Sequence, residues 1–344
     1  MTRPMPPAEW AQQRAIWTCW PSATDLWQDD LDDARREHAA MVAAILDGDA
    51  GPEVVVLACG DEAEAAARAK LPSRARVQQA GFGDIWLRDT GPLFAQEGST
   101  LVARRFGFNG WGGKYRLEGD ETVGDDVAKA AGAIRQSFPF LLEGGAVEWD
   151  GEGTLLTTRQ CLLNPNRNEG WDQARAEAAL EDALGAERVL WLDEGLANDH
   201  TDGHIDNLAR FVAPGHVVCQ RPAGPDDPNH DVLVDIERAL AAMTDARGRS
   251  LKVSTVPSPG LVEGQEGEAV PASHMNFLIT NRVVVVPVYG TDSAPLALAE
   301  LSALFPGRLV VGLSARAILT GGGAFHCITQ QEPALLAASP QGAR

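Results

Sequence analysis

Short apolar runs alternate along this chain with longer stretches in which apolar residues recur every three or four positions. The first pattern is typical of buried strands and the second of amphipathic helices. Helices are predicted at 30–46, 61–70, 170–184, 231–246 and 296–305. Strands are predicted at 54–57, 155–158, 188–192, 277–279, 283–288 and 309–313. The pattern indicates an α/β or α+β protein, and alternation alone does not select a topology.

Two pairs of runs are close enough in sequence to form hairpins. The turn Asp150–Gly151 lies within the first, at 146–158, and Asn281–Arg282 separates 277–279 from 283–288. Two loops also stand out: 221–230 contains three prolines, and 257–271 is rich in Gly, Glu and Pro. Each is long enough to cover a site, and each is equally compatible with an inert connection.

Composition narrows the class of protein. The 344 residues are 44% hydrophobic and 22% charged, which is ample for a large buried core. No linker or low-complexity segment divides the sequence, and we expect a single domain over 1–344. No apolar run is long enough for a transmembrane helix, and residues 1–7 lack the apolar stretch of a signal peptide. We therefore expect no membrane partner.

Cysteine usage and net charge exclude further classes. The five cysteines are scattered, odd in number and free of any Cys-x-x-Cys pair. A disulfide framework or zinc knuckle is therefore not expected, and a reducing cytoplasm fits. The net charge of −19 makes nucleic acid a poor partner, because phosphate binding needs clustered Lys and Arg. An acidic surface attracts small cations, although it also serves ordinary solubility.

Cys327 is the most informative residue for chemistry. It follows the glycine run Gly321–Gly323 and lies beside His326, with Thr-Gln-Gln shortly after it. Three glycines allow the backbone to bend sharply and to approach a ligand closely. Most free cysteines are simply buried, but this context favours a nucleophile, which needs a base or cationic neighbour to form a thiolate.

A second cluster places two His and three Asp between Asp199 and Asp206. If this segment is extended, Asp202, His204 and Asp206 point to one side. Such a group suits either acid/base chemistry or a metal. The Asp-x-His-x-Asp pattern is similar to a ligand motif of the manganese ureohydrolases. Their other ligand motifs are absent here, because His230–Asp231 lacks a glycine-rich context and no later Asp-x-Asp pair follows.

Two further segments carry candidate binding groups. Trp86 and Asp89 lie in a short apolar-flanked segment, where they fit either a packed indole with a buried ion pair or a site for a cation. In the second interpretation Trp86 is an apolar wall, and the carboxylate of Asp89 accepts paired N–H bonds from a guanidinium. Glu143 precedes a Gly pair and suits either the same site or a turn.

Taken together, these segments resemble agmatine deiminases, of the guanidine-modifying (pentein) superfamily that also contains bacterial peptidylarginine deiminases. The resemblance runs nearly end to end. The matching segments are 5–10, 17–21, 86–89, 108–112, 143–145, 163–168, 202–206 and 321–327.

The resemblance implies a five-bladed α/β propeller of ββαβ units with a central active site. It implies Cys327 as nucleophile and His204 as acid/base, with Asp89 and Asp206 gripping the guanidinium. It also implies that Trp86 stacks beside the alkyl chain of the substrate. The other residues that we expect to line the pocket are Glu143, Asp202 and Gly323.

The implied reaction is hydrolysis of agmatine to N-carbamoylputrescine and ammonia through a covalent thiouronium-type intermediate, a step towards putrescine and the polyamines. No metal and no organic cofactor is implied, and family members commonly form homo-oligomers. The alternatives are deimination of arginine or peptidyl-arginine, a metal-dependent ureohydrolase, and a non-catalytic guanidine-binding protein.

Overall fold

The computed structural model describes residues 3–48 and 51–336. Within these residues sixteen strands form five separate sheets. In four of them the first two strands are antiparallel, and a helix connects the second strand to a parallel third, which gives four ββαβ units. The first unit contains β4 (Leu93–Glu97), β5 (Thr100–Gly107), α6 (Val123–Ala130) and β6 (Ile134–Leu141), and the second contains β7 (Glu148–Trp149), β8 (Thr154–Thr158), α8 (Gln173–Leu184) and β9 (Arg188–Leu192). The third contains β10 (Ala209–Ala213), β11 (His216–Arg221), α9 (His230–Ala241) and β12 (Lys252–Pro257). The fourth contains β13 (Leu278–Ile279), β14 (Val283–Val288), α10 (Ala294–Leu304) and β15 (Leu309–Ser314).

The remaining unit joins the two ends of the described chain. Its first strand is β16 (Thr329–Pro333), which pairs antiparallel with β1 (Gln13–Cys19). Helix α2 (Leu31–Ile45) leads to β2 (Glu53–Ala58), parallel to β1, and α3 (Asp61–Lys70) leads to a fourth strand, β3 (Arg76–Gln79). The ββαβ pattern therefore occurs five times, as the resemblance predicted.

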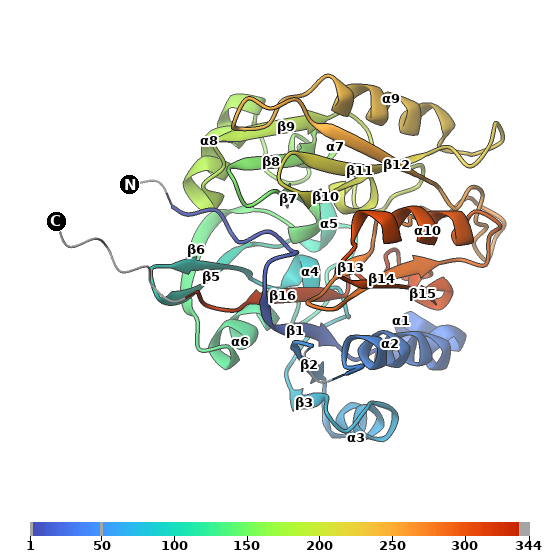
Figure 1. Ribbon diagram of the computed structural model, residues 1–344. Coiled ribbons are helices and arrows are strands. Elements are labelled where there is room, and N and C mark those ends of the chain that lie inside the picture. The colour runs from blue at the N-terminus through green and yellow to red at the C-terminus, as the bar shows by residue number, and fades with distance from the viewer. Residues whose placement is uncertain (1–2, 49–50, 337–344) are drawn as a thin grey trace.

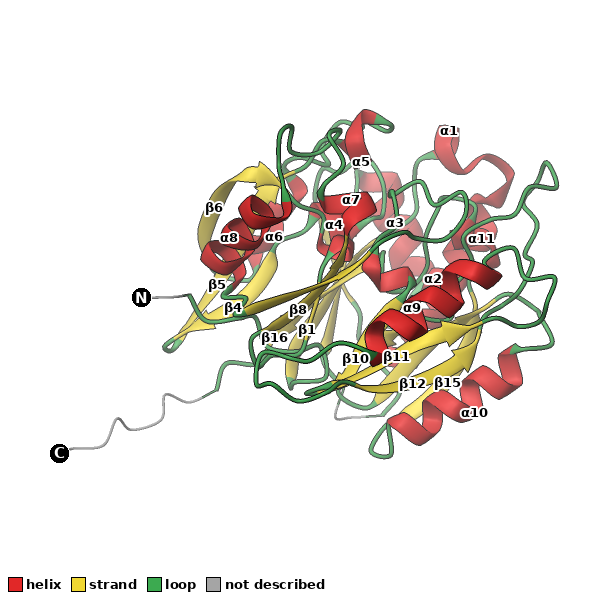
Figure 2. Cartoon of the chain, turned by 90° about the horizontal axis from the view of Figure 1, so that it is seen from above, coloured by secondary structure: helices red, strands yellow, loops and turns green. Residues whose placement is uncertain are grey.

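The five sheets follow one another around the middle of the molecule, where the short helix α4 (Leu87–Thr90) lies (Figure 1). Helix α10 lies at the outer edge, outside its own strands (Figure 2). Strands that are covered on both faces consist of continuous apolar runs, such as the four valines that begin β14. Helix α2 buries one stripe of side chains at helical spacing, from Leu31 through Met41 to Ile45.

The predicted elements are confirmed, with differences at some helix ends. Helix α8 begins at Gln173 because the side chain of Asp172 accepts a hydrogen bond from the Arg175 amide, and it ends at Gly185, which adopts a left-handed conformation. The prediction of 231–246 was too long at its end. Beyond Ala241 the side chain of Asp245 accepts the amides of Arg247 and Arg249, which favours a turn over another helical turn. Both predicted hairpins are present.

None of the helices in the described ranges combines the length and the apolar character that crossing a bilayer requires.

Candidate active site

Five segments that each precede the first strand of a unit bring polar side chains towards one place. Helix α4 precedes β4 and carries Asp89. The 3-10 turns η2 (Gly144–Ala146) and η3 (Ile205–Asn207) precede β7 and β10 and carry Glu143, His204 and Asp206 at or beside their starts. The last two segments precede β13 and β16 and carry Asn276 and Cys327.

Cys327 lies at the bottom of this arrangement. Its Sγ is 3.0 Å from Nδ2 of Asn276 and 3.5 Å from Oδ2 of Asp206. Its carbonyl accepts the amide of Arg88, which joins the segment to α4. Burial, Asp206 and Asp89 raise the pKa of the Cys327 thiol well above its usual value. Without a ligand, these surroundings favour the neutral thiol over the thiolate.

The surroundings of the two aspartates shift their pKa values in opposite directions. Asp89 accepts the amide of Gly145 and the indole N–H of Trp111, both at 2.9 Å. Burial, then Asp206 and Glu143, raise the pKa of Asp89 to about 8. For Asp206, burial raises the pKa, but the hydrogen bond and charge of His326, whose Nδ1 lies 2.7 Å from Oδ2, outweigh it and lower the pKa. Oδ1 of Asp206 is buried without a hydrogen-bond partner among the described residues.

His204 is fully buried, and neither ring nitrogen has a hydrogen-bond partner within the described ranges. Burial lowers its pKa to about 3, although the charge of Asp206 opposes this effect. A methyl group at Gly145 would lie 2.6 Å from Nδ1 of His204, 3.0 Å from Asp89 Oδ1 and 3.1 Å from Asp206 Oδ2. Three reactive groups thus converge at a point where only glycine leaves room. Unpaired buried polar atoms are rare in folded proteins, which indicates that a polar ligand completes them.

The prediction that Asp202 and His204 lie along one extended strand is wrong. Asp202 and Gly203 have φ values of 63° and 85°, so the chain turns sharply before η3. The carboxylate of Asp202 instead binds Lys114 at 2.6 Å and Arg167 at 2.6 Å. The two aspartates of the Asp-x-His-x-Asp pattern therefore belong to different clusters, which does not match a shared metal site.

Arg167 connects Glu143 to the same cluster. Its Nε donates to Oε1 of Glu143 at 2.7 Å, its Nη1 to Asp202, and its Nη2 to the carbonyl of Thr201. Burial raises the pKa of Glu143, and Arg167 opposes that shift. Glu143, His204 and the thiol of Cys161 have potential ligand atoms within 4.8 Å of one another, but the guanidinium of Arg167 already neutralises this carboxylate.

A cavity of about 210 Å³ opens above Cys327. The indole of Trp86 forms one wall and stacks on Trp27 at 6.2 Å, and Asp84 accepts both indole N–H groups at 2.8 and 2.9 Å. A methyl group at Gly323 would lie 2.8 Å from the Trp86 ring and 3.0 Å from Sγ of Cys327. The residues that line the cavity are Leu26, Trp27, Asp84, Trp86, Asp89, Trp111, Tyr115, Leu117, His200, Thr201, Thr320, Gly321, Gly322 and Cys327.

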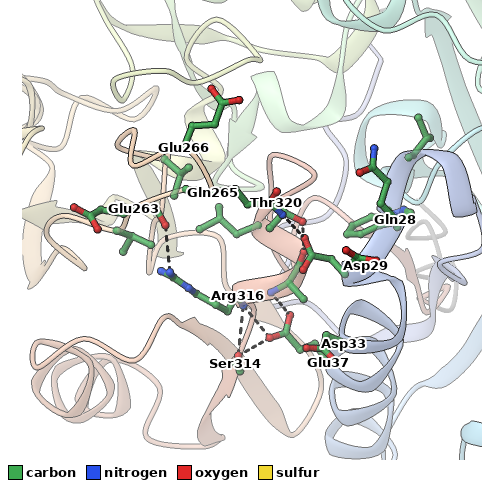
Figure 3. A pocket seen from close by; sticks show the side chains of 18 of the residues that line it. Gln28, Asp29, Asp33, Glu37, Glu263, Gln265, Glu266, Ser314, Arg316 and Thr320 are labelled. Atoms are coloured by element: carbon green, nitrogen blue, oxygen red, sulfur yellow. Dashed lines mark hydrogen bonds between the residues drawn. The ribbon is translucent and has the colours of Figure 1, made fainter.

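A larger hollow of about 750 Å³ adjoins this cavity and shares Leu26, Trp27 and Thr320 with it (Figure 3). The predicted loop 257–271 contributes residues 262–266, 268 and 270 to its wall, whereas loop 221–230 does not reach it. Most of the charged residues that line it are acidic. The carboxylates are Asp29, Asp30, Asp33, Glu37, Glu263, Glu266 and Glu268, and the two arginines are Arg36 and Arg316.

The structure places seven of the predicted residues around one site: Cys327, His204, Asp206, Asp89, Glu143, Trp86 and Gly323. The residues of the site that were not predicted are Trp111, Arg167, Asn276 and the pair Glu9–His326. Glu9 lies in the matching segment 5–10 and Arg167 in 163–168, so both were within reach of a residue-by-residue interpretation. Asn276 gave no signal beyond its position next to an apolar run.

Glu9 holds a buried ionic network behind the site. Its Oε2 contacts Arg210 Nη2 and lies 3.1 Å from His326 Nε2, and its Oε1 accepts the amide of Ile279. Burial raises the pKa of Glu9, but Arg210 and His326 outweigh it and lower the pKa to about 2. The stabilisation is therefore fully present above the unfolded pKa near 4.5 and is lost as the pH falls towards 2.

Replacing Glu9 by Leu removes one of the two carboxylates, Glu9 and Glu148, that pair with the buried guanidinium of Arg210. We expect the free energy of unfolding at neutral pH to fall by about 3 kcal/mol, because removing one partner from a buried ionic network leaves the remaining charge incompletely compensated. Urea unfolding followed by tryptophan fluorescence measures it. Glu62→Leu, at an exposed position on α3, is the matched control and is expected to change stability little. An equal change in both variants would contradict the prediction.

The comparisons with known proteins agree with this geometry. The model of the Porphyromonas-type peptidyl-arginine deiminase family matches residues 5–333. The sequence is 37% identical to the agmatine deiminase of Pseudomonas fluorescens, over 95% of each chain. The structure is similar to that of an Enterococcus faecalis agmatine deiminase, with a TM-score of 0.89, 32% identity and 96% of each chain covered. A Pseudomonas aeruginosa DDAH shares the fold at a TM-score of 0.54 and 12% identity, over 93% of this chain and 99% of that one.

Proposed function

We propose that this chain, which belongs to the Porphyromonas-type peptidyl-arginine deiminase family, hydrolyses agmatine to N-carbamoylputrescine and ammonia. The observation that carries the choice of substrate is the lining of the 210 Å³ cavity. It contains the carboxylates Asp84 and Asp89, and neither Arg nor Lys is among the described residues that line it. Agmatine has a guanidinium and an amine but no carboxylate, whereas free arginine would need a cationic partner for its carboxylate.

The arginines that lie near the motifs are committed elsewhere. Arg88 donates to Gln330 and Gln331, and Arg167 is bound to Glu143 and Asp202. Arg159 pairs with Asp193. All three therefore have partners outside the cavity, which supports agmatine over arginine.

The first half of the proposed reaction forms a covalent intermediate. Asp89 and Asp206 bind the N–H groups of the guanidinium, fix its plane and keep it charged, which makes the carbon a better electrophile. Cys327 transfers its thiol proton to His204, and the resulting thiolate adds to that carbon and gives a tetrahedral centre. His204 donates a proton to the departing nitrogen, so that ammonia leaves and a thiouronium remains.

The second half releases the product. Neutral His204 takes a proton from water, and the resulting hydroxide adds to the thiouronium carbon. The C–S bond then breaks, which returns the thiolate and leaves the ureido group. Gly145 leaves the space in which His204, Asp89 and Asp206 face one point. Trp86 supports the alkyl chain, and Glu143, held by Arg167, borders His204.

One assay tests this function against its alternatives. Ammonia, urea and the ureido product are measured with agmatine, arginine and an arginyl peptide, with and without a chelator. We expect ammonia and N-carbamoylputrescine from agmatine, at an unchanged rate in chelator. A preference for arginine or the peptide, urea as product, or no turnover would each overturn the proposal in favour of a different alternative.

The raised pKa of the Cys327 thiol predicts that a bound substrate helps to form the thiolate that attacks it. Burial, Asp206 and Asp89 raise the thiol pKa, and a bound guanidinium would offset both carboxylates. We expect methylguanidine to lower the apparent pKa of Cys327 alkylation by iodoacetamide, which is measured as a rate over a range of pH. The pKa is compared rather than the rate, since a ligand also shields the sulfur. Equal apparent pKa values with and without methylguanidine would contradict this expectation.

The acidic hollow beside the cavity predicts a salt dependence. Its carboxylates raise the local concentration of a cationic substrate, and added salt screens that field. We expect KM for agmatine to rise about threefold to tenfold between 50 and 500 mM NaCl, with kcat nearly constant. Alkylation of Cys327 by neutral iodoacetamide is the control and should not respond. A KM that is independent of salt would show that the hollow has no such role.

We also propose that residues 1–344 form one catalytic domain, because side chains from all five units meet at the site. A homo-oligomer and a cytoplasmic location stay predictions.

A further inference from the structure

Four of the five converging segments supply groups that the proposed reaction uses. The fifth segment, which precedes β13, supplies the side chain of Asn276, for which that reaction has assigned no role. Asn276 is 1% exposed and lies against the sulfur of Cys327. The side chain of Asn276, which lies just before β13 as the other groups lie just before the first strands of their units, is therefore a candidate member of the same site.

Both ends of the Asn276 side chain are occupied. Oδ1 accepts the backbone amides of His326 at 3.1 Å and of Cys327 at 3.2 Å. Nδ2 donates to Oδ1 of Asn207 at 2.9 Å and to Sγ of Cys327 at 3.0 Å. The two bonds at Oδ1 determine which way the amide faces, because Oδ1 can only accept and Nδ2 can only donate. The N–H that points at the sulfur is thus fixed by the backbone of the nucleophile itself.

The surroundings of the sulfur make this donor important. Burial, Asp206 and Asp89 raise the pKa of Cys327, whereas the backbone of Ala324 and the amide of Asn276 lower it. Among the described residues, Asn276 is the side chain that donates a hydrogen bond to Sγ. A thiol is a weak acceptor and a thiolate is a strong one, so the bond is worth more when the sulfur is charged.

We propose that Asn276 is a thiolate-stabilising residue of this enzyme. Its Nδ2–H donates to the Cys327 thiolate before attack, and it receives the same thiolate again when the C–S bond breaks. Through Oδ1 it also holds the backbone that aims the sulfur at the guanidinium carbon. This role rests on the proposed deimination for its place in the reaction, but the stabilisation of the thiolate is a property of the free protein.

Alkylation of the free protein tests it. The apparent pKa of Cys327 is measured from the rate of reaction with iodoacetamide in the wild type, Asn276→Ala and Asn276→Asp. We expect the pKa to rise by about one unit in Asn276→Ala, a loss of one charge-assisted hydrogen bond. The rise should be larger in Asn276→Asp, which puts a third carboxylate beside the sulfur. We expect kcat/KM at neutral pH to fall about tenfold or more in both.

Ser273→Ala is the matched control. Ser273 lies in the same segment and donates to the carbonyl of Asn207, but it is not a hydrogen-bond partner of Cys327. It is expected to keep the wild-type pKa of Cys327. Unchanged pKa values in the Asn276 variants, or the same shift in Ser273→Ala, would overturn the proposal. Failure of agmatine turnover in the wild type would count against the proposed function alone.

A second measurement needs no variant at position 276. In the wild type, the 1H–15N signals of the Asn276 side chain should move with the titration of Cys327, and they should stay constant over that range in Cys327→Ser. Signals that do not follow the thiol in the wild type would overturn the proposal even if the Asn276 variants did not fold.

Discussion

Cys327→Ser is expected to lower the release of ammonia from agmatine by at least about 10⁴-fold, because it replaces the nucleophile by a poorly ionised hydroxyl. The side chains of Ser and Cys are nearly isosteric, and the hydrogen bond from Asn276 can still form. The protein should therefore fold and bind agmatine. The measurements are steady-state ammonia release and isothermal titration with agmatine.

Cys59→Ser is the control for this substitution. Cys59 is exposed, and it is not one of the residues that line the cavity. Its rate should equal that of the wild type. An undiminished rate in Cys327→Ser would remove the covalent mechanism, whereas loss of both activity and agmatine binding would indicate a folding defect instead.

His204→Gln is expected to have the next largest effect, a fall in kcat of about 10²–10⁴-fold, which is the range for removal of a general acid–base group. The imidazole must take the thiol proton of Cys327, give it to the departing nitrogen and later take a proton from water, and Gln can do none of these. KM should change much less, because Asp89 and Asp206 hold the guanidinium. Steady-state kinetics separates the two parameters.

His216→Gln provides the comparison. His216 is partly exposed on β11 and bonds to Ser254, away from the cavity. It should keep nearly full kcat. A His204→Gln variant whose KM rises while kcat is maintained would assign His204 to binding rather than to proton transfer.

The local pattern predicted five of the longer helices and six of the sixteen described strands, because most of those strands are buried and those helices bury one face. It did not predict which strands pair. Strand β1 lies between β2, its next strand in sequence, and β16, which is about 310 positions away. The ββαβ repeat came from the family resemblance. The end of α9 was misjudged because a side-chain interaction of Asp245 competes with the helix, and apolar spacing does not report such competition.

The site divides in the same way. Cys327, His204 and Asp206 were evident because rare reactive residues lay next to glycines or to one another. Asp202 was placed with them on the assumption of an extended path, which its φ of 63° excludes. Asn276 and Glu9 act through partners far away in sequence, and the contact between Glu9 and His326 spans 317 positions. One sequence without its fold does not reveal such pairs.

The pairing of β1 with β16 has a consequence for synthesis on the ribosome. Strand β1 is translated about 310 positions before its antiparallel neighbour, so one edge of its sheet stays open until that neighbour is made. The reactive sulfur lies two residues before β16. A nascent chain therefore gains its nucleophile and completes the sheet of β1 at nearly the same point of synthesis, and shorter translation products lack both.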